Sequence, residues 1–365
     1  MKKIINFIKR DTVLCISAIL AVISMFFVMP SADYLSYIDF RTLALLFCLM
    51  AVMAGFREIG VFSALANSLL EKSKNFRIIS LILIMLCFFT SMLITNDVAL
   101  ITFVPFAIEV VKKSGKNEFM VPIVILQTIA ANLGSMLTPM GNPQNLYLYS
   151  LSGMSLTDFI IVVLPYTVIS FVLLIIFNFS VNPSHIEYKM EKLHFPIKAA
   201  IFYTVMFFVC ILTVINIIDY KMCLIITTVA IIIFNRKMLL RVDYSLLLTF
   251  VFFFIFVGNM GNIEEFKNLI LALLKGKEMI VSVVASQVIS NVPAAVLLSG
   301  FTTDYNNLIV GVNIGGLGTL IASMASLISY KFFVESMPNS KGRYIVKFTL
   351  WNIIFLVILL LFYFI

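Results

Sequence analysis

Thr95-Asn96-Asp97 interrupts an apolar run that continues on both sides of it. A second polar stretch, Ser290-Asn291-Val292-Pro293, divides another apolar run nearer the carboxyl end. Backbone and amide groups without partners are costly in hydrocarbon, so such stretches persist in a membrane only where they line a site. The two interruptions therefore predict a pair of polar sites within apolar surroundings.

The composition predicts an all-α polytopic membrane protein. Over 365 residues the chain is 62% hydrophobic and only 12% charged, which is far from the composition of soluble domains. Runs such as 13–29, 157–179 and 348–365 carry little or no charge, and a helix needs about 20 apolar residues to cross a bilayer. Membrane lipid is therefore an expected partner. Nucleic acid is not, because the net charge of +8 falls in clusters between the apolar runs.

The basic clusters predict which side of the membrane each connection faces. They contain Lys2, Lys3, Lys9 and Arg10, then Lys72, Lys74 and Arg77, then Lys112, Lys113 and Lys116, then Arg236, Lys237 and Arg241, and finally residues 331–347. The alternate connections are neutral or mildly acidic. By the positive-inside rule, we expect a multi-pass protein of the cytoplasmic membrane with a cytoplasmic amino terminus and an extracytoplasmic carboxyl terminus. His185 and His194 fall in a polar cytoplasmic loop without metal-binding spacing.

The two polar tips lie between helices that are short for a membrane crossing. The runs 78–94 and 98–111 hold 17 and 14 residues. At about 1.5 Å per residue they reach about 25 and about 21 Å, against a core of roughly 30 Å. The arms around the second tip are shorter still. These lengths predict two re-entrant helical hairpins, ~78–111 and ~279–301. The alternative is a pair of ordinary short crossings joined by a tight external turn.

Each hairpin is followed by a span that carries helix breakers near its middle. Residues 121–150 contain Gly134, Pro139, Gly141 and Pro143, and residues 307–333 contain Gly311, Gly315, Gly316 and Gly318. Glycine alone would suit close helix packing. Glycine and proline together with Asn142, Gln144 and Asn145 instead predict freed backbone groups and half-helix ends that face a cavity.

The order of the elements predicts two inverted repeats. Ile38-Asp39-Phe40 opens one unit and Val242-Asp243-Tyr244 opens the other; each continues with an amphipathic stretch, a hairpin, a broken span and a closing span. Inverted repeats with discontinuous helices place a substrate site near the bilayer midplane. The predicted division is 1–180 for the first repeat (spans ~11–29 and ~39–55, hairpin ~78–111, broken span ~121–150, span ~157–179), 181–220 for a cytoplasmic loop and linker span, and 221–365 for the second repeat (spans ~221–235 and ~243–259, hairpin ~279–301, broken span ~307–333, span ~345–365).

At these residues the chain resembles the ion transporter superfamily, which includes citrate transporters, divalent-anion/sodium symporters, arsenite permeases and sodium/proton antiporters. The resemblance covers nearly the whole chain and rests on the order hairpin, broken span, hairpin, broken span. Dicarboxylate symporters resemble one another in a Ser-Asn-Thr tip at both hairpins. The tips here, together with residues 137–143, resemble the arsenite-permease and antiporter branch more.

The resemblance implies a homodimer in which each subunit has a scaffold domain and a mobile domain. The mobile domain would contain both hairpins and both broken spans and would move in an elevator-like fashion. The sequence contains no HExxH motif, nucleophile elbow or nucleotide-binding loop. We therefore expect no enzyme activity and no cofactor, with Na⁺ or H⁺ as the coupling ion.

Asp97 is the one carboxylate placed deep inside an apolar segment. A charged group there usually faces a pathway, so Asp97 is predicted to bind the coupling cation or to carry a proton. The alternative is that Asp97 caps a helix beginning at Val98. Small and polar residues complete the predicted site. Those expected to bind substrate are Thr95, Asn96, Thr138, Asn142, Ser290, Asn291, Asn313, Gly316 and Thr319, and those expected to bind the coupling cation are Asp97, Asn96, Asn291, Gly134 and Gly315.

No Arg or Lys falls near the tips in the two hairpins and two broken spans. An anion would then be held by amides, hydroxyls, helix amino ends and bound cations. The leading prediction is a cation-coupled secondary active transporter for a small carboxylate or inorganic oxyanion, working by alternating access. An exporter of arsenite or another neutral metalloid and a sodium/proton antiporter are the alternatives within transport. A channel is the alternative from another class.

Overall fold

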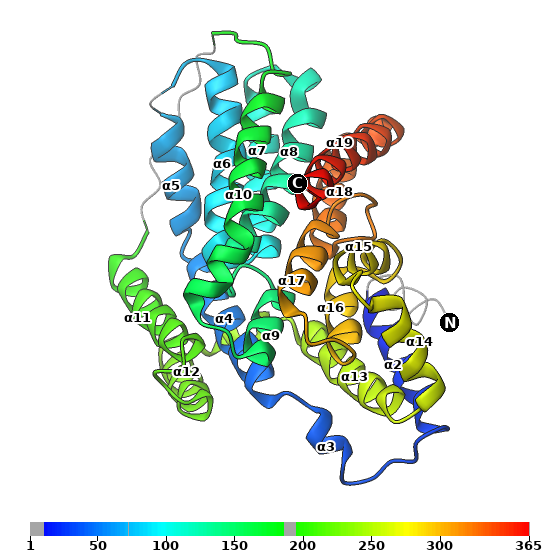
Figure 1. Ribbon diagram of the computed structural model, residues 1–365. Coiled ribbons are helices and arrows are strands. Elements are labelled where there is room, and N and C mark those ends of the chain that lie inside the picture. The colour runs from blue at the N-terminus through cyan, green and yellow to red at the C-terminus, as the bar shows by residue number, and fades with distance from the viewer. Residues whose placement is uncertain (1–10, 72, 186–194, 365) are drawn as a thin grey trace, which may run out of the picture.

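The computed structural model describes residues 11–71, 73–185 and 195–364, and every regular element in them is a helix (Figure 1). Eight segments of the described chain are long and apolar enough to cross a membrane: Phe40–Glu58, Phe76–Ile94, Asn117–Leu137, Leu156–Asn178, Ile197–Val214, Tyr220–Arg241, Tyr244–Gly261 and Pro338–Tyr363. The predicted all-α polytopic membrane protein is confirmed. Lys2, Lys3, Lys9, Arg10, Lys72 and His194 lie outside the described residues.

The first helices of the described chain lead to the first polar tip. They are α2 (Thr12–Met25), α3 (Tyr34–Tyr37), α4 (Phe40–Glu58), α5 (Val61–Leu70), α6 (Phe76–Ile94) and α7 (Asn96–Lys113). The span predicted over 11–29 is too long, since α2 ends at Met25. Pro30 lacks the amide that a continuing helix needs, and the Tyr34 hydroxyl donates to the Val28 carbonyl at 2.5 Å.

The middle of the chain contains the first broken span. Its elements are η1 (Asn117–Phe119), α8 (Met120–Gly134), η2 (Ser135–Leu137), α9 (Pro143–Ser152), α10 (Leu156–Asn178), α11 (Ile197–Val214), α12 (Tyr220–Asn235) and η3 (Arg236–Arg241). The helix resumes at Pro143 because proline suits a first helical position. Asn142 caps α9, and its Oδ1 accepts from the Asn145 amide at 2.9 Å.

The remaining elements contain the second tip and the second broken span. They are α13 (Tyr244–Gly261), α14 (Glu264–Leu274), α15 (Glu278–Ile289), α16 (Asn291–Ser299), α17 (Tyr305–Ile314), α18 (Met324–Ser336), η4 (Pro338–Ser340) and α19 (Lys341–Tyr363). Gln287 supports the break between α17 and α18. Its Nε2 donates to the Gly315 and Leu317 carbonyls at 2.8 Å each, and the Thr319 amide donates to its Oε1 at 3.0 Å.

The two tips have nearly the same backbone conformation. Thr95, between α6 and α7, has φ 67° and ψ 147°, and Ser290, between α15 and α16, has φ 73° and ψ 154°. Positive φ at a non-glycine residue costs of the order of 1–3 kcal/mol and persists only where the surroundings hold it. Here the next amide is held in each case: Asn96 donates to the Gly141 carbonyl at 3.0 Å, and Asn291 to the Ala322 carbonyl at 2.9 Å.

The arms of the first tip are longer than the sequence predicted. α6 has 19 residues and α7 has 18, so they reach about 28 and about 27 Å. Asn75 caps α6 ahead of the apolar run by accepting from the Arg77 amide at 3.0 Å, and α7 continues over Lys112 and Lys113. Charged residues do not stop a helix that has left the apolar core. The length argument for re-entrance therefore applies only to α15 and α16, with 12 and 9 residues.

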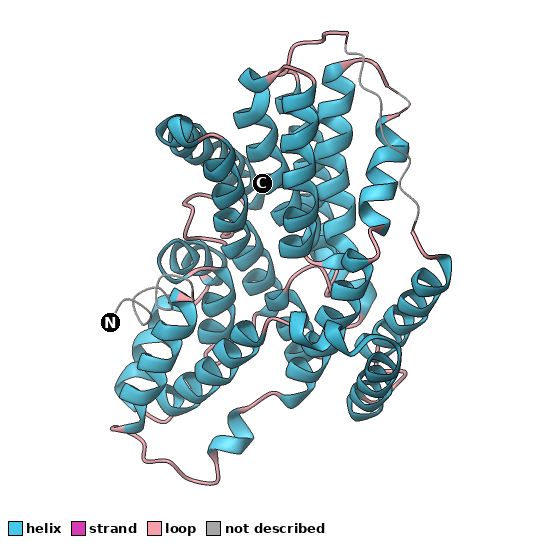
Figure 2. Ribbon diagram, turned by 180° about the vertical axis from the view of Figure 1, so that it is seen from behind, coloured by secondary structure: helices cyan, strands magenta, loops and turns pink. Residues whose placement is uncertain are grey.

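The helices fall into spatial groups that are not contiguous in sequence. In Figure 1, α6, α7, α8 and α10 stand side by side in the upper part, α11 and α12 lie against α4 at lower left, and α2 lies beside α13 at lower right. Figure 2 shows the same helices from behind, joined by loops. α18 packs against α7 and α8, so the second broken span lies next to the first tip.

Candidate substrate and cation site

Four helices begin around one small cavity. They are α7 at Asn96, α9 at Pro143, α16 at Asn291 and α18 at Met324. The cavity has a volume of about 10 Å³, which is about the space of one water molecule. Its lining consists of Asn96, Asp97, Pro143, Gln144, Leu246, Asn291, Val292, Ser323, Met324 and Ala325. The first amides of a helix have no partner within that helix and carry partial positive charge, so four such ends around one cavity favour negative charge inside it.

Buried asparagines join the two broken spans beside this cavity. Asn142 donates to Asn313 Oδ1 at 3.0 Å, and Ser323 donates to Asn132 Oδ1 at 3.1 Å. Asn132 also accepts from Asn96 Nδ2 at 3.1 Å. Asn313 Nδ2 donates to Asn145 Oδ1 at 2.6 Å. Because buried amides that pair with one another fix their neighbours, the network sets the positions of the first tip and of both breaks.

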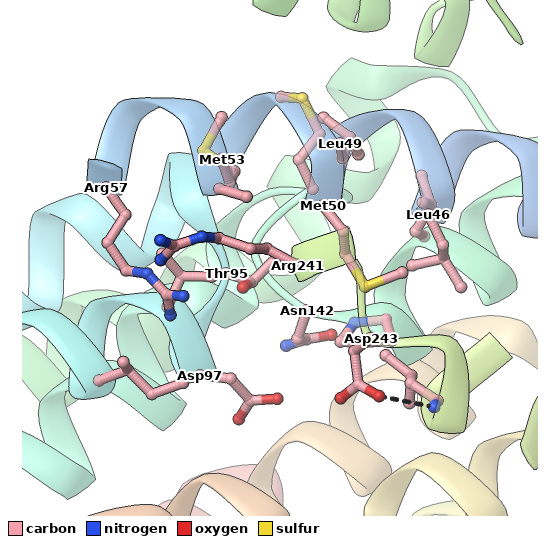
Figure 3. Close-up of a pocket in the computed structure, with 17 residues that line it drawn as sticks. Leu46, Leu49, Met50, Met53, Arg57, Thr95, Asp97, Asn142, Arg241 and Asp243 are labelled. Carbon is pink, nitrogen blue, oxygen red and sulfur yellow. Dashed lines mark hydrogen bonds between the residues drawn. The ribbon is translucent and has the colours of Figure 1, made fainter. Parts of the chain in front are cut away.

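A larger cavity of about 120 Å³ adjoins the small one, and Asp97, Pro143 and Leu246 line both. Its polar residues are Arg57, Thr95, Asp97, Asn142, Arg241 and Asp243 (Figure 3). Apolar residues of α4, among them Leu46 and Met53, form much of the rest. The tip segments themselves lack basic residues near the tips, but the site does not, because α4 and η3 bring Arg57 and Arg241 to it.

Asp97 does not cap a helix. α7 begins at Asn96, one residue before Asp97, and the Asp97 amide donates to Asn96 Oδ1 at 2.9 Å. Among the described residues, no donor contacts the Asp97 carboxylate, which is half-buried and faces the larger cavity (Figure 3). The capping interpretation is wrong because the positive φ of Thr95 starts the helix earlier. A carboxylate in the first helical turn still interacts favourably with the helix dipole.

Some of the other predicted site residues lie at the cavities and some do not. Thr95, Asn96, Asn142 and Asn291 line one or the other cavity. The Thr138 hydroxyl donates to the Met92 carbonyl, and the Ser290 hydroxyl donates to the Ala322 carbonyl at 3.4 Å. Asn313 belongs to the asparagine network, and the Gly316 carbonyl accepts from Asn132 at 3.5 Å.

Three predicted residues are engaged elsewhere. Thr319 is exposed and lines neither cavity, and its amide donates to Gln287 Oε1 at 3.0 Å. Gly134 packs against α6, where an added Cβ would lie 2.1 Å from the Phe88 carbonyl oxygen. Gly315 packs against α15, where an added Cβ would lie 2.6 Å from Ser286 Oγ. The two glycines thus allow close approach of helices, and their role as cation ligands stays a prediction.

Sequence reasoning missed Asn132, Gln144, Ser323 and the two arginines as members of the site. A signal existed for Asn132, which precedes Gly134 by two positions as Asn313 precedes Gly315. No comparable local signal marks Arg57 or Arg241, because both stand at the ends of spans, where arginine commonly marks only the cytoplasmic side.

The sequence profile that describes citrate transporters matches residues 2–304 of this chain. The chain belongs to the citrate transporter family. This confirms the resemblance to the ion transporter superfamily and the expectation of a membrane transporter rather than an enzyme. The match includes both tips, the first broken span and all of α16, so the small cavity is built largely within the matched region.

Three similar proteins include two that are named as transporters. An uncharacterized transporter of Methanocaldococcus jannaschii is 33% identical over 301 residues, covering 80% of this chain and 81% of the relative. The inner membrane protein YbiR of Escherichia coli is 28% identical over 334 residues, which is 86% of each chain. A silicon efflux transporter of Oryza sativa subsp. japonica is 30% identical over 141 residues, covering 39% of this chain and 29% of its own length.

Proposed function

We propose that this chain is a secondary active transporter that moves a small anion, a carboxylate or an inorganic oxyanion, across the cytoplasmic membrane in exchange with or together with Na⁺ or H⁺. The observation that carries the proposal is the convergence of four helix amino ends, at Asn96, Pro143, Asn291 and Met324, on a small cavity that adjoins a larger one of about 120 Å³. Such ends hold anions without a dedicated cationic side chain.

Asp97 is the proposed coupling residue. Its carboxylate is half-buried, receives no hydrogen bond from the described residues and lines both cavities. A carboxylate in that position is suited to bind Na⁺ or to carry a proton between the two sides. Asn96, which precedes it, would supply an amide oxygen to the same cation, and Asn291 would do so from the second tip.

Matching contacts at the two tips support the two inverted repeats. Thr95 and Ser290 share one backbone conformation, and the amide that follows each is bonded to a carbonyl in the adjacent break. In the proposed cycle the two tips and two broken spans move together relative to a scaffold that includes α2, α4 and α11–α13. The elevator-like motion, the homodimer and the cytoplasmic amino terminus belong to this proposal.

A metalloid exporter is the second candidate. The observation in its favour is the similarity to the silicon efflux transporter of Oryza sativa. A second relative, of Dictyostelium discoideum, is named putative transporter arsB and is 27% identical over 124 residues. A neutral hydroxide of arsenic would fit a cavity lined by amides and hydroxyls. Because these matches cover 39% and 34% of this chain, they support the candidate over part of its length only.

Uptake into proteoliposomes tests the proposal. The purified chain is reconstituted and offered labelled citrate, succinate, phosphate and arsenite under an imposed Na⁺ or H⁺ gradient. We expect gradient-dependent, saturable accumulation of at least one anion. Movement of Na⁺ or H⁺ that needs no anion would contradict the proposal, and transport of arsenite alone would favour the second candidate.

A further inference from the structure

Two arginines reach the larger cavity from opposite parts of the sequence. Arg57 stands in the last turn of α4, and Arg241 ends η3. Figure 3 shows their guanidinium groups next to each other near Thr95, on the side of the cavity that also holds Asp97. Two like charges at close range repel each other, and the repulsion is strongest where water is restricted.

The acidic groups around the cavity offset only part of this charge. Arg241 Nη2 lies 2.8 Å from Glu58 Oε2, but the two side chains are 44% and 42% exposed, so this ion pair is weak. Asp243 Oδ1 accepts from the Leu246 amide at 3.0 Å at the start of α13. Asp97 lies in the first turn of α7. The amino ends of α13 and α7 therefore already compensate both aspartates in part.

Arg57, unlike Arg241, has no ion-pair partner among the described residues. Among the described residues, none forms an ion pair or a hydrogen bond with its guanidinium group, although it is half-buried and lines the cavity. A basic residue in the last turn of a helix interacts favourably with the helix dipole, and this would explain an arginine at position 57. It does not explain why the side chain is directed into a cavity that holds a second guanidinium group.

We propose that Arg57 and Arg241 together bind the carboxylate or oxyanion group of the transported anion before it reaches the small cavity. This inference rests on the proposed function and names the residues that capture its substrate. Guanidinium groups bind such anions in a bidentate way. The cavity volume of about 120 Å³ accommodates a small carboxylate or a tetrahedral oxyanion. Since Asp97 and Pro143 line both cavities, an anion released by the arginines is already at the helix amino ends.

The pair also distinguishes between substrate classes. A neutral metalloid hydroxide gains little from two guanidinium groups, whereas an anion gains charge-assisted hydrogen bonds from both. Binding that depends on Arg57 and Arg241 should therefore be confined to anions and should weaken as salt screens the charges.

Ligand-induced thermal stabilisation of the purified protein tests this proposal, with citrate, succinate, phosphate and arsenous acid compared at fixed ionic strength. At least one anion should stabilise the unmodified chain. Arg57→Gln and Arg241→Gln should each raise the half-saturating anion concentration by at least about tenfold, and Arg57→Lys should restore part of the loss. Arg236→Gln, an exposed residue at the start of the same 3-10 helix as Arg241, should leave it unchanged.

Half-saturating concentrations that stay unchanged in Arg57→Gln and Arg241→Gln, while the unmodified chain accumulates the same anion in proteoliposomes, would overturn this proposal and leave the proposed function standing. The proposal would also be overturned if arsenous acid stabilised the unmodified chain and lost this effect in both variants in parallel with the anions. Conversely, anion binding that depends on both arginines without any anion uptake would retain the capture site and contradict the proposed function.

Discussion

Asn142 and Asn313 lie 171 positions apart in the sequence and are joined by a buried hydrogen bond of 3.0 Å from Nδ2 to Oδ1. A second bond, from Ser323 to Asn132 at 3.1 Å, joins the same two broken spans in the reverse sense. In each bond, a residue that follows the break in one broken span donates to an asparagine in the other broken span. That asparagine lies near the end of the helix before the break. The two broken spans are therefore held as one unit, as a common movement would require.

The asparagine bond makes a prediction for stability. Asn142→Ala and Asn313→Ala should each lower the free energy of unfolding by about 1–3 kcal/mol, because each leaves a buried amide without its partner. The double variant should lose less than the sum of the two, by about 0.5–3 kcal/mol, because the second change removes a bond that is already broken. Thermal unfolding in detergent measures all three. Strictly additive losses would show that the two side chains do not act on each other.

Asp97→Asn tests the proposed coupling role of Asp97. The substitution preserves the size of the side chain and removes its charge, so folding should be retained while the dependence of uptake on the Na⁺ or H⁺ gradient is lost. Glu109→Gln is the matched control on the same helix, since Glu109 is exposed and its pair with Lys113 at 2.5 Å contributes ~0–1 kcal/mol. Uptake that keeps its gradient dependence in Asp97→Asn would assign Asp97 a structural role only.

Gly134→Ala tests the close packing of α8 on α6. An added Cβ would lie 2.1 Å from the Phe88 carbonyl oxygen and 2.8 Å from Ser91 Oγ. The backbone must shift to admit it, and we expect a loss of about 1–3 kcal/mol in stability. Gly342→Ala, at a helical position with nothing within 4 Å, should leave stability unchanged or raise it slightly. Equal unfolding temperatures for the two variants would argue against this packing.

The hydrogen bonds of Gln287 should slow amide hydrogen exchange at the break between α17 and α18. Gln287→Met removes both donors to the Gly315 and Leu317 carbonyls and the acceptor of the Thr319 amide. Hydrogen exchange at residues 315–319 should become faster because the break loses its side-chain support. Exchange at the Asn96 amide, which donates to Gly141, should not change and serves as the internal control. Unchanged exchange at Thr319 would mean that the break is stable without Gln287.

Local signals in the sequence were enough to find the helix breaks. Asn142-Pro143 and the glycines after Asn313 restrict or free the backbone at a few positions, and the helices end and begin there. The tips at Thr95 and Ser290 were found because polar residues stand out in apolar runs. The lengths of α6 and α7 were underestimated because a run of apolar residues marks the buried part of a helix, not its ends.

The rest of the site depends on contacts between distant elements, which no local pattern records. Arg57 and Arg241 reach the larger cavity only because α4 packs against η3. Thr319 resembles a site residue in sequence, but it is exposed, lines neither cavity and donates its amide to Gln287. Polar residues in a broken span are thus good candidates for a site, and tertiary packing decides which of them face it.

The most direct test asks whether the transported anion occupies the space between the two tips. Val292→Cys places a thiol at the small cavity, and Asn306→Cys places one at an exposed polar position at the start of α17. Both are made in a chain whose five native cysteines have been replaced. The rate of labelling by a small charged thiol reagent is measured with and without saturating anion. The account predicts that the anion slows labelling of Val292→Cys and leaves Asn306→Cys unaffected. Equal labelling of Val292→Cys in both conditions, in protein that still transports the anion, would contradict it.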